Sequence, residues 1–344
     1  MKSSPYSPDE FMAGLYGKLY ADPYAEAKTK EDALAIGKEI REKAKSIFTA
    51  DKLGGGDYKL EKAGKALEYK DYTLQKYSFE LCENLKSAVY LLTPKSIKKT
   101  APAVVSLCGH GYGVRQILGI TKSGNKKHIR YLDNYQKKFA VELAKRGCVV
   151  AAPELFGFGE ARLKKDLIKP FYISSCDELS HHLLPYGLTT ASVRVLQAVA
   201  CGKILLNQKC VDPERLGIMG ISGGGLTALY ASVIDESFKK TVISGYVNTF
   251  ESSILSMWHC PDNYIPNILT VGEIYDFAAS LAPRKLLIES GTKDKLFPIE
   301  ASKKAHAKIR NAYSLIGASD KLQIDVFDGK HSVSGRKSFD FLAE

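Results

Sequence analysis

The chain lacks any long hydrophobic run. Every apolar stretch in its 344 residues is interrupted by Lys, Asp, Glu or Gly within about ten residues, whereas a membrane-spanning helix needs ~18 uninterrupted apolar residues. The opening segment, MKSSPYSPDEFMAG, also lacks the apolar core of a secretion signal. We therefore expect neither a membrane span nor a secretion signal.

Cysteine is scarce and shows no recognisable pairing pattern. The seven cysteines, at positions 82, 108, 148, 176, 201, 210 and 260, form no CxxC motif and no even framework. Thinly spread cysteines of this kind are typical of reduced thiols in a cytoplasm. The pattern predicts a cytoplasmic protein without a structural zinc site or any other metal ligand set.

The chain has no concentrated block of one charge, although Lys and Arg (49) outnumber Asp and Glu (38) to give a net charge of +11. The densest basic stretches, 95–99, 122–130 and 303–310, lie far apart in the sequence, and no base-stacking motif accompanies them. This pattern indicates a lysine-rich solvated surface rather than a nucleic-acid interface. We expect a small-molecule partner, no nucleic acid and no membrane, and the sequence leaves assembly into a homo-oligomer open.

The hydrophobic content, 45%, is sufficient for a large core. Residues 9–50 carry apolar side chains at helical spacing, with Asp9 as the expected cap, and a run of three glycines follows. We therefore expect an N-terminal helical extension over residues 1–56 and one main domain over 57–344. The main domain begins with residues 58–92, whose period-2 alternation predicts an antiparallel meander.

From Pro102 onward, short apolar runs alternate with helical segments. The runs occupy 103–108, 148–153, 215–220, 240–246, 285–290 and 322–327, and the main helices are expected at 130–147, 189–206 and 299–313. Strands that are apolar on both faces are typical of a buried, mostly parallel sheet. The sequence therefore predicts an α/β fold with helices flanking a central sheet.

A possible nucleophile follows the run at 215–220. The sequence continues G-I-S-G-G-G, which places Ser222 between Gly220 and Gly224 at a strand-to-helix junction. Glycines are needed there because the nucleophile occupies a tight turn, where larger neighbours would clash with the strand and the helix. The motif alone is weak and a glycine-rich structural turn is the alternative, but the flanking strand and helix favour a nucleophile elbow.

A serine nucleophile needs a base and an acid that orients the base. Asp294 lies just past one strand in a loop closed by Pro298, and His331 follows the last strand, so the order is Ser, Asp, His. The other histidines lie in surface helices, an acidic run, a glycine-rich loop or an apolar insert. Among the acids, Asp294 is preferred over Asp276, Asp325 and Asp328 because it alone follows a strand end at the required place.

The reaction would also need backbone N–H donors for an oxyanion. Gly223 directly follows the serine, and the loop CGHGYG after an earlier strand offers Tyr112. A plain glycine-rich turn is the alternative interpretation of that loop.

Residues 248–280 form a longer and more aromatic connection than a crossover helix requires. We expect this insert to form a pocket wall, although a core cluster explains its aromatic residues equally well. The candidate substrate-binding residues are His110, Phe156, Trp258, His259 and Tyr264.

These motifs, together with PELFGFGEAR, VDPERLGIMG and APRKLLIESGTKDKLFP, resemble the α/β-hydrolase superfamily over about residues 85–340. Within it, the chain is similar to the branch of dienelactone hydrolases and acetyl xylan esterases. The resemblance implies a serine esterase without metal or organic cofactor. The loop FGFGE and the pair His331-Ser332 depart from the pattern of sugar deacetylases, and the cysteine nucleophile of true dienelactone hydrolases is absent.

The sequence thus predicts a hydrolase of carboxylic esters, with acetyl-type acyl groups preferred. Peptide or amide cleavage by the same three residues is the alternative within enzymes, and no propeller domain that could anchor peptides is evident in the sequence. A binding protein that uses this fold without catalysis is the alternative outside enzymes.

Overall fold

The computed structural model describes residues 4, 6–48, 50–120 and 135–344. The basic stretch at 122–130 and the start of the helix expected at 130–147 lie outside the described residues.

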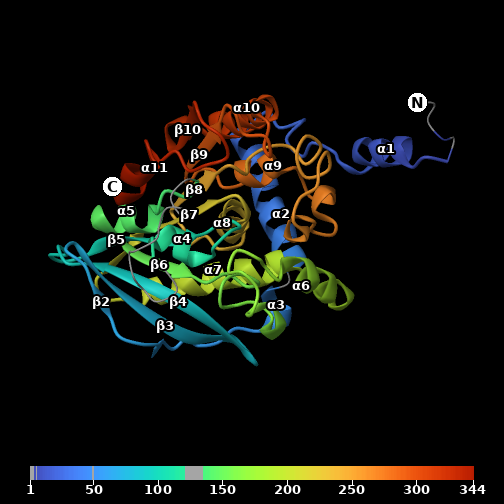
Figure 1. Cartoon of the computed structure of the whole chain (residues 1–344). Coiled ribbons are helices and arrows are strands. Elements are labelled where there is room, and N and C mark those ends of the chain that lie inside the picture. The colour runs from blue at the N-terminus through green and yellow to red at the C-terminus, as the bar shows by residue number, and fades with distance from the viewer. Residues whose placement is uncertain (1–3, 5, 49, 121–134) are drawn as a thin grey trace.

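One ten-stranded sheet organises the main domain (Figure 1). The strand order is β1-β3-β4-β6-β5-β7-β8-β9-β10, and β2 pairs with β3 outside this path. The first strands pair antiparallel through the β4–β6 pair, and all later pairs are parallel. The strands are β1 Glu61–Lys62, β2 Leu67–Glu68, β3 Tyr72–Cys82, β4 Leu85–Pro94, β5 Ala101–Leu107, β6 Val149–Pro153, β7 Val211–Ile221, β8 Lys240–Ser244, β9 Lys285–Gly291 and β10 Leu322–Phe327.

Helices cover the sheet because the central strands are apolar on both faces; β5, β6 and β8 are buried along their whole length. α7 and α8 pack on β5, β6, β7 and β8, while α5 and α11 pack together on β5. The α-helices are α1 Asp9–Leu19, α2 Lys30–Phe48, α3 Ala50–Leu53, α4 Val114–Leu118, α5 Phe139–Lys145, α6 Cys176–Leu183, α7 Thr190–Leu206, α8 Gly223–Ile234, α9 Ile274–Ala279, α10 Ile299–Ile316 and α11 Ser338–Ala343. Short 3-10 helices are η2 Lys164–Asp166, η3 Leu184–Tyr186, η4 Pro261–Asn263, η5 Ile268–Thr270 and η6 Ser319–Lys321.

The sequence predicted the six later strands and the antiparallel meander correctly, but residues 135–138 are not helical and Asp9 is not the first cap residue of α1. α5 begins at Phe139, and the preceding Tyr135 and Gln136 instead bond the loop after β5, where Tyr135 Oη donates to the His110 carbonyl. α1 is capped by Pro8 rather than Asp9, which lies in the first turn. The first error arises because these polar side chains bond outside the helix, and the second is a shift of one residue at a helix end.

The N-terminal extension is docked on the main domain (Figure 1). α2 contacts α8, α9 and α10, and its buried Phe48 packs against Tyr230 of α8 with ring centroids 4.6 Å apart. α1 has no buried residue, but Tyr16 and Tyr20 at its end donate hydrogen bonds of 2.7 and 3.0 Å to Glu273 and Asp276. The extension therefore contacts the 248–280 insert directly.

Asp276 makes the stability of this contact depend on pH. The carboxyl group is buried, and burial raises its pKa from 3.8 to about 7. The folded chain therefore binds more protons than the unfolded chain between about pH 4 and pH 7, and stability falls as the pH rises through that window.

We expect Asp276→Asn to remove this part of the pH dependence. Between pH 5 and pH 7.5, the parent chain should lose about 2–3 kcal/mol more of its unfolding free energy than the variant does. Urea unfolding at both pH values measures the difference, and Asp71→Asn, which changes an exposed carboxylate, is the matched control. Parallel pH profiles for the parent chain and Asp276→Asn would contradict the expectation.

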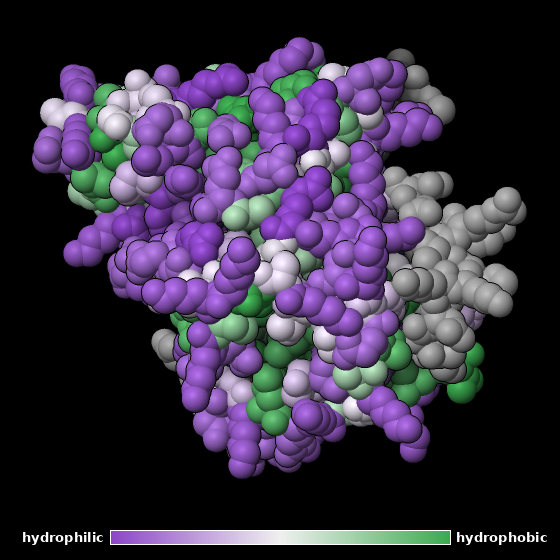
Figure 2. All heavy atoms as spheres, turned by 90° about the vertical axis from the view of Figure 1, so that its left-hand side faces the viewer, coloured by the Kyte–Doolittle hydropathy of each residue, from purple (hydrophilic) through white to green (hydrophobic). Residues whose placement is uncertain are grey.

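The surface in Figure 2 is mainly hydrophilic, and the hydrophobic side chains on this face form small separate groups. Within the described part of the chain, no single helix is long and apolar enough to cross a membrane. Two consecutive helical segments, Cys176–Tyr186 and Thr190–Leu206, reach the required length and apolar content only when taken together, and the chain bends by 96° between them.

Candidate active site

Ser222 occupies the turn between β7 and α8, as the motif predicted. Its backbone has φ 57° and ψ −123°, a conformation that residues other than glycine rarely adopt, and its N–H donates to the Ser244 carbonyl at 3.0 Å. A Cβ at Gly220 would overlap the carbonyl group of Gly224, and one at Gly224 would overlap that of Leu107. These close approaches are the physical reason for the glycines on either side of the serine.

His331 and Asp294 lie at the ends of the neighbouring strands and contact each other. The Nδ1 atom of His331 lies 2.7 Å from Asp294 Oδ2. The other oxygen of this buried carboxylate accepts hydrogen bonds from the N–H groups of Leu296 and Phe297, at 2.9 and 3.1 Å. The loop thus fixes the carboxylate so that one oxygen faces the imidazole.

The three competing carboxylates have other partners. Asp328 is exposed and pairs with Lys293 at 2.6 Å. Asp325 pairs with Arg336, and Asp276 caps α9. Of the four acids that the sequence offered, the structure places Asp294 against His331.

Aromatic rings hold the imidazole of His331. The rings of Tyr135 and Phe297 are stacked on it, with centroids 5.6 and 5.7 Å away. A Cβ at Gly245, directly after β8, would lie 3.1 Å from the imidazole, so only glycine leaves the ring undisturbed there. The Nε2 atom is buried and has no hydrogen-bond partner among the described residues. The backbone N–H of Ser222 bonds the end of β8, and the His331 ring lies against the next residue, Gly245, so the two residues lie at the same end of the sheet.

Glu289 anchors the loop that carries His331, and the sequence analysis did not single it out. This buried β9 residue accepts hydrogen bonds from the N–H groups of Ser334 and Gly335, both at 2.9 Å, and from the hydroxyl of Ser244. An acidic residue inside the apolar run KLLIES was the available signal, because a buried carboxylate needs partners of this kind.

The two expected oxyanion donors lie in the predicted turns. Gly223 is the first residue of α8, and a Cβ at this position would lie 3.2 Å from the His110 ring. The Tyr112 N–H donates a long hydrogen bond, 3.4 Å, to Gln116 Oε1. The donor role of both groups stays a prediction.

Beside Gly223 lies a buried charged network that the sequence did not reveal. Asp262 pairs with the buried guanidinium of Arg194 and lies 3.3 Å from Nε2 of His110. Burial disfavours a charged His110, but the Asp262 carboxylate outweighs it and raises the pKa of His110 to about 10. Arg194 also donates to the Phe156 carbonyl at 2.9 Å and lies over the ring of Phe158, 4.0 Å from its centroid.

The candidate substrate-binding residues fall into two groups. Trp258, His259 and Tyr264 of the insert line one cavity of about 340 Å³ together with Ser180 and His181 of α6. Trp258 is 80% exposed, whereas His259 is buried, and burial lowers its pKa. His110 instead contacts Asp262, and the Phe156 carbonyl accepts from Arg194; neither residue lines this cavity.

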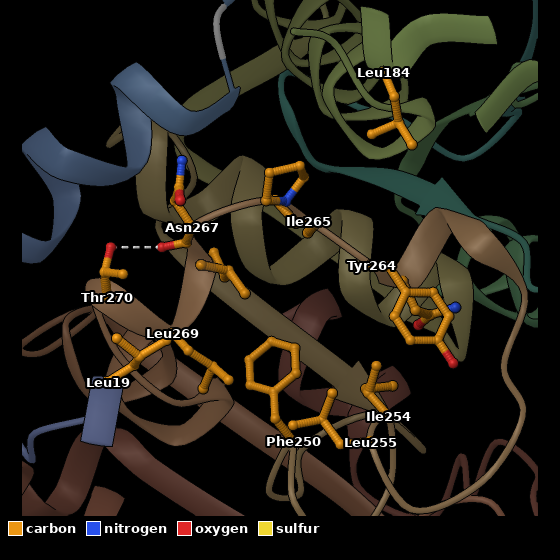
Figure 3. A pocket seen from close by; sticks show the side chains of 13 residues that line it. Leu19, Leu184, Phe250, Ile254, Leu255, Tyr264, Ile265, Asn267, Leu269 and Thr270 are labelled. Carbon is orange, nitrogen blue, oxygen red and sulfur yellow. Dashed lines mark hydrogen bonds between the residues drawn. The ribbon is translucent and has the colours of Figure 1, made fainter. Parts of the chain in front are cut away.

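The insert also forms a larger apolar cavity of about 390 Å³ (Figure 3). Phe250, Ile254, Leu255, Ile265 and Leu269 of the insert line it, and Leu19 of α1 lies beside Leu269 at its edge. The N-terminal extension therefore contributes to a cavity of the insert.

A serine on a strand-to-helix turn and an Asp–His pair beyond two later parallel strands define the α/β-hydrolase fold. The chain has this fold, as its sequence resemblance implied.

Comparison with known proteins agrees with this assignment of the fold. A model of the prolyl oligopeptidase family matches residues 189–338. "Putative hydrolase YtaP" of Bacillus subtilis (strain 168) is 24% identical over 241 residues, which are 68% of this chain and 74% of that protein.

Two solved structures show the likeness over nearly the whole chain. The "putative acetyl xylan esterase" of Bacteroides fragilis NCTC 9343 has a TM-score of 0.80 at 17% identity, covering 94% of this chain and 83% of that one. A CE15 glucuronoyl esterase from Teredinibacter turnerae T7901 has a TM-score of 0.64 at 15% identity, covering 99% and 93%.

Proposed function

We propose that the chain is a serine hydrolase that cleaves carboxylic esters through Ser222, His331 and Asp294. The observation that carries the proposal is the Asp294–His331 contact at the same end of the sheet as a serine on a strand-to-helix turn. Esterase names among the structural neighbours support it.

In the first step, His331 Nε2 accepts the proton of the Ser222 hydroxyl as the serine oxygen bonds to the ester carbonyl carbon. The tetrahedral intermediate then expels the alcohol, which takes the proton from His331, and leaves an acyl-serine. Water, deprotonated by the same imidazole, attacks the acyl-serine. The second tetrahedral intermediate releases the acid as His331 returns the proton to the Ser222 oxygen. Asp294 keeps the proton on Nδ1, so that Nε2 faces the serine.

Gly223 and Tyr112 donate their N–H groups to the oxyanion in this mechanism. The Tyr112 N–H now makes a long bond to Gln116, which it exchanges for the shorter and stronger bond to a negatively charged oxygen. The reaction needs no organic cofactor.

The substrate is a small ester with a short acyl group. Aromatic side chains occupy two of the proposed positions: Tyr135 and Phe297 stack on His331, and Tyr112 packs edge-on against Tyr172 with centroids 5.9 Å apart. We expect these rings to limit the length of the acyl chain. The seven free thiols favour a reducing compartment, the cytoplasm, as the location of the enzyme.

The test measures kcat/KM for a series of acyl esters and one aminoacyl amide. We expect acetyl and propionyl esters to be cleaved at least ~10-fold faster than octanoyl esters, because a closed wall rejects added methylenes. A rate that rises steadily with chain length would contradict this, since each methylene would then gain up to ~0.8 kcal/mol from apolar surface.

The same series separates the alternative functions. Amide hydrolysis with poor ester turnover would favour a peptidase, the activity to which the match with the prolyl oligopeptidase family points. A chain that neither turns over any ester nor reacts with a serine-directed phosphonate would be a non-catalytic binding protein.

A further inference from the structure

Four side chains with metal-binding atoms converge next to the candidate active site. They are His110 of the loop after β5, Cys176 at the start of α6, and Cys260 and Asp262 of the insert. One ligand atom from each lies within 4.8 Å of all the others. The chain offers an imidazole nitrogen, two sulfurs and a carboxylate oxygen, which is a donor set that suits zinc.

The distance between the ligand atoms of His110 and Asp262 is that of two ligands on one tetrahedral ion. Bonds of about 2.0–2.3 Å to a central zinc place its ligand atoms roughly 3.3–3.8 Å apart. His110 Nε2 and Asp262 Oδ2 are 3.3 Å apart, yet the buried Nε2 has no hydrogen-bond partner among the described residues. Two polar atoms that approach each other without hydrogen-bond geometry are expected where both point at a common ion.

Arg194 supplies a positive charge next to the four ligands. Its guanidinium donates to Cys176 Sγ at 2.7 Å and to Asp262, and it is itself buried. Zinc with two thiolates and one carboxylate carries a net charge of −1, which the arginine neutralises. Groups that hydrogen-bond to metal ligands in this way orient them and keep them deprotonated.

We propose that His110, Cys176, Cys260 and Asp262 form a structural zinc site. Four protein ligands complete the coordination of the ion, so the site offers no open position for chemistry. The ion ties α6 and the insert to the loop after β5. Gly223 lies beside it, since a Cβ added to this glycine would be 3.6 Å from Asp262 Oδ2.

The test uses the full-length chain, reduced, stripped with a chelator and then loaded with Zn²⁺. We expect one zinc per chain after gel filtration, measured by elemental analysis, and a melting temperature raised by roughly 4 °C at a hundredfold excess over Kd. Cys176→Ser and Cys260→Ser should lose the zinc. Cys210→Ser, which changes a cysteine outside the cluster, should keep it.

Cobalt gives a second measurement on the unmodified chain, so the result does not depend on whether a variant folds. Co²⁺ in this site should show thiolate charge-transfer bands and the intense visible bands of tetrahedral coordination. The proposal fails if the reduced chain binds less than stoichiometric zinc, if both serine variants keep it, or if cobalt shows no thiolate bands. It also fails if Cys176 and Cys260 bind no zinc and peroxide treatment of the chain merely joins them in a disulfide. These readouts are independent of ester hydrolysis.

Discussion

Replacing Ser222 with alanine is expected to abolish acyl-enzyme formation and to lower kcat by more than ~10⁴-fold. The substitution removes the only atom that bonds to the acyl group. It should leave the fold intact, because Ser222 makes no side-chain cap of α8, and alanine has the same Cβ at the same unusual φ. The melting temperature should change by no more than about 2 °C.

Mass spectrometry after treatment with a fluorophosphonate checks this result. The parent chain and Ser314→Ala, which changes an exposed serine of α10, should gain the mass of one label, and Ser222→Ala should gain none. Labelling of Ser222→Ala at the parent rate would show that another residue is the nucleophile.

The second large effect concerns the acid. Asp294→Asn should lower kcat by up to ~10⁴-fold with little change in KM. The amide has the shape of the carboxylate, but its nitrogen can face Nδ1 of His331 and favour the tautomer whose Nε2 carries the proton. That imidazole cannot accept a proton from the serine.

Asp328→Asn is the matched control, since Asp328 is only three residues from His331 but pairs with Lys293 at the surface. Its kcat should fall less than ~3-fold, because an exposed ion pair contributes little. Steady-state rates of both variants on one short ester decide the assignment, and it is wrong if Asp328→Asn is the crippled variant.

Features that follow from short sequence patterns, or from the regular geometry of a parallel sheet, were predictable from the sequence. The buried strands follow from short apolar runs, and the turn at Ser222 follows from glycines whose missing side chains prevent overlap with Gly224 and Leu107. The Asp294–His331 contact was also predictable, because parallel strands bring their carboxyl ends to one edge of the sheet.

What escaped prediction depends on residues far apart in the chain. The convergence of Cys176 and Cys260 is one such feature, because the two cysteines are separated by 84 positions (260 − 176) and their spacing carries no metal signature. Arg194 lies in an apolar helix whose pattern gives no hint of its partner Asp262. The start of α5 was missed for a related reason: Gln136 bonds Gly109 and Gln116 across the fold instead of continuing a helix.

The backbone at Ser222 has a thermodynamic consequence. A non-glycine residue in such a conformation costs about 1–3 kcal/mol, which is a substantial fraction of the ~5–15 kcal/mol that keeps a typical domain folded. Glycine would adopt the same angles almost without cost. Glycine at position 222 would therefore remove this cost and give four consecutive glycines from 222 to 225, and under the proposed function the serine is retained there for its hydroxyl at the expense of stability.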